Sequence, residues 1–234
     1  MSRKTLVIVG GVAGGASAAA RARRLSEEAN IIVFERGPHV SFANCGLPYY
    51  IGGEIATRDA LLLHTPASLK ARFGLDVRVR SEVVAIDREN RSVQVRELDS
   101  GSEYAQSYDA LILSTGAAPL TPPIPGINRA GHFTVRTVPG IEAMSSWIQD
   151  ARAVRAVVVG AGYIGLEMAE QLRRRSLDVA LVEALPQVMG PLDPEMAALL
   201  QQELCAHGVE LVLHNPVAAF EPPRLGESAQ ASVV

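Results

Sequence analysis

The side chain best suited to redox chemistry in this sequence is the thiol of Cys45. It lies in the run 41–53, ten residues after Glu35, and the other cysteine, Cys205, is far away along the chain. Residues 48–53 are expected to form a short helix, whose positive N-terminal end would stabilise a thiolate. The sequence therefore predicts a single redox-active sulfur. The alternative is a small buried apolar side chain, the usual role of a lone cysteine.

Two copies of one pattern surround this thiol along the chain. The first copy covers residues 7–35 and ends in Glu35, and the second covers residues 157–183 and ends in Glu183. Each copy predicts a strand, a glycine-rich turn, a helix and a second strand that ends in glutamate. This is the pattern of a Rossmann dinucleotide-binding unit, and its repetition makes the prediction much stronger than one copy would.

The glycines of each copy indicate how a nucleotide would be held. The second copy has the complete set Gly160, Gly162 and Gly165, whereas the first has Val12 at the middle position. Small residues there let the backbone approach a pyrophosphate, which the helix N-terminus then binds. The terminal glutamate, 25 residues after Gly10 in the first copy and 23 after Gly160 in the second, would accept from ribose hydroxyls. The alternative is a glycine-rich turn without a ligand.

The segments between and after the copies predict the rest of an α/β fold. Residues 77–87 and 92–96 alternate like antiparallel strands, with a turn at 99–101. Residues 108–119 predict a buried strand that runs into a turn of small residues, which would contact a cofactor or be an ordinary exit from a strand. Four prolines within residues 119–125 predict a connector.

Two further helices are expected in the second half of the chain. They cover residues 140–150 and 196–207. In the later one, Leu199, Leu200 and Leu204 have core spacing, and Cys205 beside them is predicted to be structural.

Composition excludes several classes of function. The chain has 234 residues, 48% of them hydrophobic, which is enough for a core and for one or two domains. Its net charge of −3 gives no electrostatic reason to expect nucleic-acid binding. Two cysteines cannot form a disulfide framework, so a cytoplasmic location is expected. No apolar run approaches the roughly 20 residues of a membrane span, and no metal site is expected.

Taken together, these motifs resemble the pyridine nucleotide-disulfide oxidoreductases, specifically the single-cysteine branch of coenzyme A-disulfide reductases and NADH-dependent persulfide reductases. The resemblance extends from Lys4 to about Pro216, and its most specific segments are residues 10–15, 41–45, 114–116 and 160–167. That branch also differs from the glycine pattern at the position of Val12. The resemblance implies FAD on the first unit, NADH on the second, and electron transfer through Cys45 to a small-molecule disulfide or persulfide.

The resemblance also assigns individual residues. The residues expected to contact FAD are Gly10, Val12, Ala13, Gly14, Glu35, Arg36, Val83, Ser114, Thr115 and Gly116. Those expected to contact NADH are Gly160, Gly162, Tyr163, Ile164, Gly165 and Glu183. Those expected to bind the substrate, coenzyme A held as a mixed disulfide on Cys45, are Ser17, Arg21, Arg24, Ser41 and Asn44. Of these, Ser41 and Asn44 would position the thiol. The alternative for the arginines is a solvated helix face. Phe73 stands where the family has a basic residue, although Lys70 and Arg72 are close in sequence.

The resemblance predicts the domain organisation as well. Residues 1–118 would form the FAD-binding domain, 119–150 a connector and helix, and 151–234 an incomplete NAD(H)-binding domain. Family members continue through a second FAD-binding stretch and a C-terminal dimerisation domain. We therefore expect the N-terminal part of a longer, homodimeric enzyme, and weak FAD binding with negligible turnover for these residues alone.

Two other functions fit the same motifs. One is an NADH oxidase or peroxidase, in which the thiol cycles through sulfenic acid. The other is a truncated, non-catalytic protein that only binds the cofactors. Arginines near Ser17 favour the reductase, because oxygen and peroxide need no nucleotide site. NADH is expected rather than NADPH, because Glu183 would repel a 2′-phosphate and residues 184–186 offer no cation.

Overall fold

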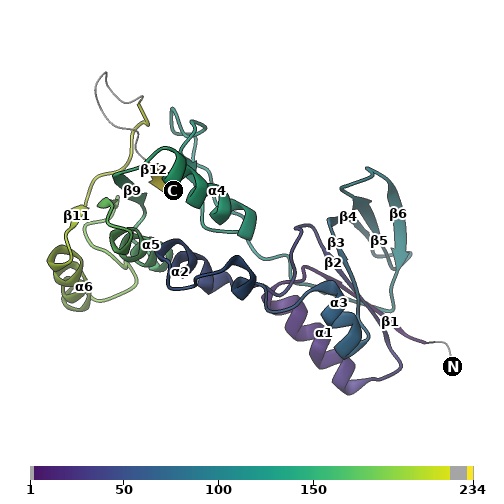
Figure 1. Cartoon of the computed structure of the whole chain (residues 1–234). Coiled ribbons are helices and arrows are strands. Elements are labelled where there is room, and N and C mark those ends of the chain that lie inside the picture. Colours follow the sequence, from purple (N-terminus) through teal and green to yellow (C-terminus); the bar gives the residue numbers. More distant parts are fainter. Residues whose placement is uncertain (1–2, 222–230, 234) are drawn as a thin grey trace. The chain divides into compact units, whose positions relative to one another are not determined.

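The computed structural model describes residues 3–221 and 231–233, which form two compact units (Figure 1). The first unit consists of Met1–Ala43 and Leu62–Ala117, and the second of Asn44–Leu61 and Ala118–Val234. The segment that carries Cys45 therefore packs with the second unit, although it lies within the range 1–118 expected for FAD binding. The assignment of one cofactor to each domain stays a prediction.

The first unit is built on a four-stranded parallel sheet. Its strands, in the order β3-β2-β1-β7, are β3 (Asp76–Val79), β2 (Asn30–Glu35), β1 (Thr5–Val9) and β7 (Ala110–Leu113). Helices α1 (Ala13–Leu25) and α3 (Pro66–Phe73) cover one face. Side chains of a strand alternate between its faces, so Ile31 and Val33 pack beneath these helices while Ile32 and Phe34 face the other way. Both faces are buried, as the apolar run in β2 requires.

A three-stranded antiparallel sheet covers the second face. It consists of β4 (Ser81–Asp87), β5 (Ser92–Glu97) and β6 (Glu103–Ser107), and Val93 and Val95 of β5 join the core. The prediction of one antiparallel strand over 77–87 was wrong at its start. Arg80 has a φ of +51°, and this left-handed residue ends β3, which pairs in parallel with β2, before β4 begins. The turn at 99–101 is confirmed, with Gly101 at φ +74°.

Strand β7 also differs from its prediction as a buried strand. Leu113 is 57% exposed, and Ala110 is exposed as well. Within the described residues β7 pairs with β1 alone, so it is an edge strand of this sheet and part of its side chains are exposed. The strand still brings Ser114 to the glycine turn, because a Cβ added to Gly10 would lie 2.0 Å from the carbonyl oxygen of Ser114.

The second unit repeats the parallel α/β design. Its sheet has the order β11-β10-β9-β12-β8, with strands β11 (Val209–Val212), β10 (Asp178–Val182), β9 (Arg155–Val159), β12 (Ala231–Val233) and β8 (His132–Phe133). Its longer helices are α4 (Val138–Asp150), α5 (Tyr163–Arg174) and α6 (Pro194–Ala206). Met144, Met168 and Leu172 are fully buried in its core. Both predicted strand–turn–helix–strand units are thus confirmed, in line with the expected α/β fold.

The segment 44–61 adds three short helical pieces to the second unit. They are η1 (Asn44–Gly46), α2 (Leu47–Gly52) and η2 (Arg58–Leu61). The longest, α2, packs along α5, and the two helices lie side by side in Figure 1. The predicted short helix at 48–53 is therefore present, one residue earlier.

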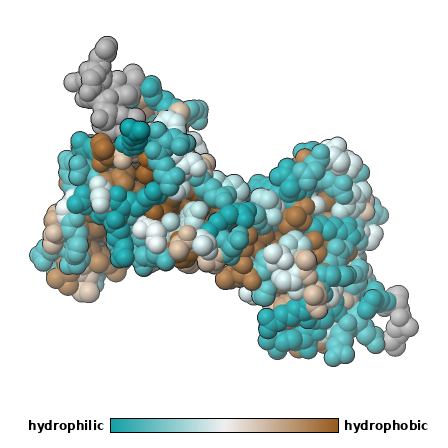
Figure 2. Space-filling model, viewed as in Figure 1, coloured by the Kyte–Doolittle hydropathy of each residue, from teal (hydrophilic) through white to brown (hydrophobic). Residues whose placement is uncertain are grey.

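Helix α6 buries its predicted core residues only in part. Leu199 is 58% exposed, Leu200 and Leu204 are half-buried, and Cys205 is exposed, so the prediction of a structural Cys205 was wrong. The buried residue is Ala197, and Leu199 lies about 200° from it around the helix. Figure 2 shows apolar side chains over α6, among other apolar areas on this face of the molecule. Among the described residues, no helix is long and apolar enough to cross a membrane.

Candidate dinucleotide and thiol sites

The glycine turn of the first unit brings the end of β1 very close to the start of α1. Gly10 has a φ of +94°, a region that side chains with a Cβ rarely adopt. A Cβ added to Gly15 would lie 1.7 Å from the carbonyl oxygen of Gly10. Only glycine at position 15 allows the two backbone segments to come this close. Any other residue there would require the turn to change.

The second unit has the same turn at the equivalent positions. Gly160 has a φ of +98°, and a Cβ on Gly165 would lie 1.9 Å from the carbonyl oxygen of Gly160. Just after the turn, Tyr163 and Ile164 are 73% and 57% exposed at the start of α5. Large exposed side chains at this point are available to contact a ligand.

Each glycine turn is followed by a helix whose N-terminus has no capping side chain. The N-cap residues Val12 of α1 and Gly162 of α5 make no side-chain capping bond, and neither first turn contains an acidic residue. By contrast, Thr65 caps α3 and Thr137 caps α4 through their hydroxyl groups. The first N–H groups of a helix have no partner within it, and the helix dipole adds positive potential there. The two glycine turns therefore fit the pyrophosphate of a dinucleotide.

The glutamate that ends each copy is fixed by backbone N–H groups. Oε2 of Glu35 accepts from the N–H of Gly11 at 2.8 Å, and its Oε1 accepts from Gly37 at 2.7 Å. Oε2 of Glu183 accepts from Ala161 at 2.7 Å, and its Oε1 accepts from Leu185 at 2.9 Å. Each carboxylate is thus held beside its glycine turn, and each oxygen keeps lone-pair capacity for a ribose hydroxyl. Sequence reasoning found both glutamates but not the four N–H donors.

The repeat extends six residues beyond each glutamate. The N–H of Ser41 donates to the carbonyl of Gly11 at 3.0 Å, and the N–H of Met189 donates to the carbonyl of Ala161 at 2.8 Å. Both residues are left-handed, with φ of +46° at Ser41 and +48° at Met189. Both copies therefore share the backbone conformation found at Ser41, so that conformation is no sign of a binding site. Only the hydroxyl group of Ser41 makes this residue a candidate for binding.

The remaining residues predicted to contact FAD lie in different surroundings. A Cβ on Gly14 would lie 3.3 Å from Oγ of Ser114, so the start of α1 meets the end of β7, where Thr115 and Gly116 are exposed. Arg36, also exposed, faces Glu82 at 3.8 Å. The side chain of Val83 packs against the core of the antiparallel layer. The structure thus brings Gly14 and Ser114 together and gives Val83 a packing role.

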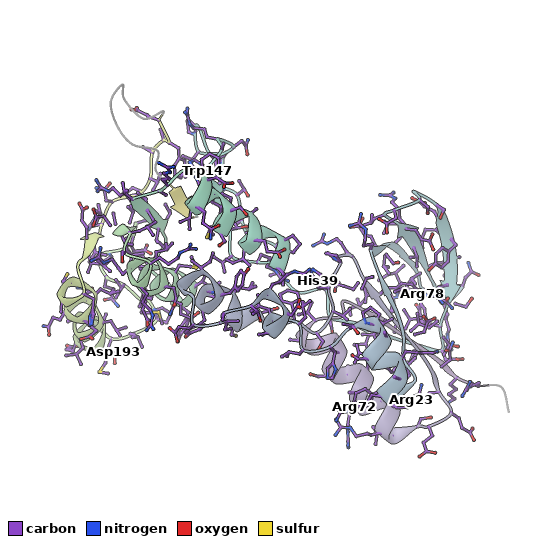
Figure 3. All side chains as sticks on the ribbon, viewed as in Figure 1. Arg23, His39, Arg72, Arg78, Trp147 and Asp193 are labelled. Carbon is purple, nitrogen blue, oxygen red and sulfur yellow. The ribbon has the colours of Figure 1, made fainter. Side chains whose placement is uncertain are left out.

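The basic residues of α1 divide into two kinds. Ser17, Arg21 and Arg24 are exposed, and their spacing of four and three residues places them on one helix face. Arg23 instead ties α1 to the end of α3, because its Nε donates to the carbonyl of Phe73 at 2.7 Å and its Nη1 donates to that of Glu27 at 2.6 Å (Figure 3). Ser17, Arg21 and Arg24 are therefore available to an anionic ligand, whereas Arg23 holds α1 against the end of α3.

Cys45 lies in η1, directly before α2, and its thiol is exposed. Asn44 beside it is exposed too, whereas Leu47 and Ile51 of α2 are buried and anchor the segment in the second unit. Cys205 is also a free cysteine, far along the same unit on α6. The structure therefore presents Cys45 as an accessible sulfur on an anchored segment.

A polar contact joins α2 to α5 in the segment that carries Cys45. The hydroxyl of Tyr49 donates to Oε1 of Glu167 at 3.4 Å. The negative charge of Glu167 raises the pKa of Tyr49 above its ordinary value. Gln171 of α5 makes a second contact with the same segment, to Glu54, and sequence reasoning missed this group entirely. In the described part of the chain, no cluster of three or more His, Cys, Asp or Glu side chains could hold a metal ion.

Sequence comparison places residues 4–228 in the family described as pyridine nucleotide-disulphide oxidoreductase. A protein named NADH oxidase from Methanocaldococcus jannaschii is 36% identical over 212 residues, which cover 90% of this chain and 47% of that protein. A coenzyme A disulfide reductase from Staphylococcus epidermidis is 40% identical over 196 residues, which cover 82% of this chain and 43% of the reductase.

Solved structures show the same relationship. The reduced CoADR-RHD protein of Bacillus anthracis superposes with a TM-score of 0.95 at 45% identity, over all of this chain and 44% of that one. A NAD-dependent persulfide reductase from A. fulgidus superposes with a TM-score of 0.89 at 36% identity, over 93% of this chain and 41% of that one. The chain spans less than half the length of each of these four proteins. On the strength of the family match and the two confirmed Rossmann units, this chain belongs to the pyridine nucleotide-disulphide oxidoreductase family.

Proposed function

We propose that this protein is an FAD-dependent oxidoreductase that uses NADH to reduce coenzyme A disulfide or a persulfide through the single thiol of Cys45. The observation that carries the proposal is an exposed cysteine without a neighbouring cysteine, in a chain with two equivalent dinucleotide turns. Similarity to proteins named coenzyme A disulfide reductase and persulfide reductase supports it.

The two turns receive different nucleotides in this proposal. In the first unit, the N-terminus of α1 would bind the FAD pyrophosphate, Glu35 the ribose, and residues 114–116 would line the site. In the second, α5 and Glu183 would hold NADH, with Tyr163 and Ile164 as side-chain contacts. When bound, the two cofactors supply hydride and electron-pair transfer, and the protein supplies their binding and the thiol.

NADH is the proposed nucleotide because of the surroundings of Glu183. Its carboxylate is fixed by two backbone N–H groups, so it cannot swing away to admit a 2′-phosphate without breaking both bonds. The residues that follow it, 184–186, are exposed and uncharged. A phosphate would therefore meet a carboxylate and no compensating cation, which favours NADH.

The thiol chemistry proceeds by exchange. The Cys45 thiolate attacks one sulfur of the substrate disulfide, forms a mixed disulfide and releases the other half as a thiolate. Two electrons from NADH, together with protons from solvent, then cleave the mixed disulfide and release the second thiol, which restores Cys45. With a persulfide, the same attack would transfer the terminal sulfur to Cys45 and release the substrate thiol, and reduction would release hydrogen sulfide.

The substrate-binding part of the proposal concerns coenzyme A. Ser17, Arg21 and Arg24 form an exposed face on α1 that suits the phosphates of a nucleotide. Ser41 and Asn44 are proposed to contact the substrate near its sulfur. Oxygen and peroxide need no such cationic face, so this feature favours the reductase. A homodimeric state and a cytoplasmic location remain predictions.

The test is thiol release and NADH oxidation with oxidised coenzyme A, measured on the 234-residue chain and on the natural protein in which this sequence occurs. The exchange step is also measurable alone: oxidised coenzyme A should form a mixed disulfide on Cys45 and release one equivalent of coenzyme A. Absence of both the adduct and the turnover would contradict the proposal.

An NADH oxidase is the second candidate, because the relative from Methanocaldococcus jannaschii bears that name. Oxygen would first take two electrons from NADH and two protons to give peroxide. Peroxide would then oxidise the same thiol to sulfenic acid with release of water, and two further electrons from NADH would restore the thiol with loss of a second water. Trapping by a sulfenic-acid reagent, and oxygen consumption that exceeds disulfide reduction, would favour this function over the reductase.

A further inference from the structure

Gln171 is a buried polar residue of α5 whose carboxamide is only partly satisfied. Its side chain is fully buried, and its Nε2 donates to Oε1 of Glu54 at 2.9 Å. Its Oε1 has no hydrogen-bond partner among the described residues. A buried amide oxygen without a partner is costly, so an apolar side chain would be the more stable choice if packing were the only requirement.

The unpartnered oxygen of Gln171 lies directly against Gly52 of α2. A Cβ on Gly52 would lie 1.7 Å from Oε1 and 2.7 Å from Cδ of Gln171. The carboxamide therefore occupies the space that any other residue at position 52 would need. This fit brings the two helices close together at the C-terminal end of α2.

Further contacts fix the rest of α2 on the same helix. The hydroxyl of Tyr49 donates to Glu167, and Arg174 approaches Oε1 of Glu54 at 3.4 Å. The side chain of Ile51 in α2 is buried as well. All the contacts belong to the second unit, and the segment that they hold begins with the turn that carries Cys45.

We propose that Gln171 is a positioning residue for the thiol of Cys45. By filling the space beside Gly52 and binding Glu54, it fixes α2 on α5, and the place of α2 determines the place of the turn before it. Helix α5 begins at the glycine turn to which NADH is assigned above, so one helix would hold the nucleotide at its start and the sulfur-bearing segment along its side. The role of Cys45 as the redox sulfur rests on the proposed function.

The test follows the position of Cys45 directly. In a Cys205→Ser background, Cys45 is labelled through a disulfide with trifluoroethanethiol, and its fluorine NMR resonance is recorded. Variants are Gly52→Ala, Gln171→Ala, their combination, and Gln171→Met, which keeps the side-chain length but cannot bind Glu54. Gln201→Ala is the matched control, because Gln201 is a helical glutamine of α6 that accepts from the N–H of Val188. Thermal unfolding is measured for each protein.

We expect Gly52→Ala to shift or split the label resonance and to lower Tm by roughly 3–10 °C, because the new methyl group overlaps the carboxamide. Gln171→Met should shift the resonance as well. The double variant should give the resonance of Gln171→Ala and not the sum of the two changes, since removing the carboxamide removes the overlap. Gln201→Ala should leave the resonance in place.

The reaction rates of unlabelled Cys45 provide a second readout. Exchange with oxidised coenzyme A should slow by roughly tenfold or more in Gly52→Ala, because a displaced nucleophile loses its orientation. Alkylation by iodoacetamide, which needs only access, should change little. An unmoved resonance in both Gly52→Ala and Gln171→Met, with a lower Tm, would overturn the proposal and leave Gln171 a purely structural role. If Gly52→Ala does not fold, the label resonance of Gln171→Met by itself tests the proposal, and an unmoved resonance overturns it.

The label experiment needs no flavin, nucleotide or turnover. If Cys45→Ser kept full reductase activity while the label behaved as expected, the proposed function would fail and the positioning role of Gln171 would stand.

Discussion

Oε2 of Glu183 accepts a hydrogen bond from the backbone N–H of Ala161 at 2.7 Å, and this bond ties the end of β10 to the glycine turn before α5. Glu35 and Gly11 repeat it in the first unit at 2.8 Å. The glutamates therefore have a structural task in addition to the proposed contact with ribose. Each carboxylate holds the N–H of its glycine turn in place, and the same hydrogen bond fixes the position of the carboxylate. Changes at either partner should affect both stability and nucleotide binding.

The glycine turns should bind their nucleotides independently. We expect Gly165→Ala to weaken NADH binding by at least tenfold, about 1.4 kcal/mol, because the new Cβ would lie 1.9 Å from the carbonyl oxygen of Gly160. Gly15→Ala should instead weaken FAD binding, since its Cβ would lie 1.7 Å from the carbonyl oxygen of Gly10. Fluorescence titration of each nucleotide against each variant checks the assignment, with circular dichroism to verify folding. The reverse pairing would refute it.

Glu183→Gln should reduce both stability and NADH preference. A glutamine side chain has one acceptor oxygen, so either Ala161 or Leu185 would lose the acceptor for its N–H, at about 1–3 kcal/mol. The ratio of NADPH to NADH dissociation constants should fall towards one. Glu210→Gln is the control, because Glu210 forms an exposed ion pair with Arg155 and such pairs contribute about 0–1 kcal/mol. A selectivity ratio unchanged in Glu183→Gln would contradict the proposed role.

Cys45 should be the site of the mixed disulfide. Cys45→Ser is expected to abolish the coenzyme A adduct at that position and all disulfide reduction, because an alcohol cannot form a disulfide. Cys205→Ser should keep the activity and change stability by less than about 0.5 kcal/mol, because Cys205 is exposed. Peptide mapping by mass spectrometry locates the adduct. Activity that depended on Cys205 and not on Cys45 would refute the proposed mechanism.

Neighbouring arginines of α1 should have different effects. Arg23→Ala is expected to lower the free energy of unfolding by about 1–3 kcal/mol, because the carbonyls of Phe73 and Glu27 lose a charged donor. Arg21→Ala and Arg24→Ala should leave Tm nearly unchanged and raise KM for oxidised coenzyme A. Thermal unfolding and steady-state kinetics on the three variants separate the two roles. A raised KM confined to Arg23→Ala would exclude the proposed substrate face.

Tyr49 should titrate above the ordinary pH range of a tyrosine. The Glu167 carboxylate raises the pKa of Tyr49 in the folded protein, so the folded state holds the proton more tightly than the unfolded state. The resulting stabilisation is fully present below the unfolded pKa of about 10 and is lost as the pH rises through the folded pKa. The difference in tyrosinate absorbance between the native chain and Tyr49→Phe measures this pKa. Glu167→Gln should lower it, and an unchanged value would show that Glu167 is not the cause.

Local patterns in the sequence were sufficient to predict the two Rossmann units. Each combines a hydrophobic strand, glycines that the turn requires, a helix and a terminal glutamate, and all of these signals lie within about 30 residues of one another. The structure contains both units at the predicted places, with Gly10 and Gly160 in the left-handed conformation that glycine favours. The turn at 99–101 was equally local and equally predictable.

Tertiary structure decided what depends on contacts between distant segments. Residues 77–87 alternate as one strand would, yet β3 pairs in parallel with β2 whereas β4 pairs antiparallel with β5, and alternation alone does not distinguish these partners. Leu199 was predicted to face the core with Leu200 and Leu204, but the buried residue of α6 is Ala197 and Leu199 is exposed, because burial depends on what packs against a helix. Gln171 and Gly52 are 119 positions apart in the sequence. No periodicity links them, and only the packing of α2 on α5 brings the carboxamide into the space that glycine leaves.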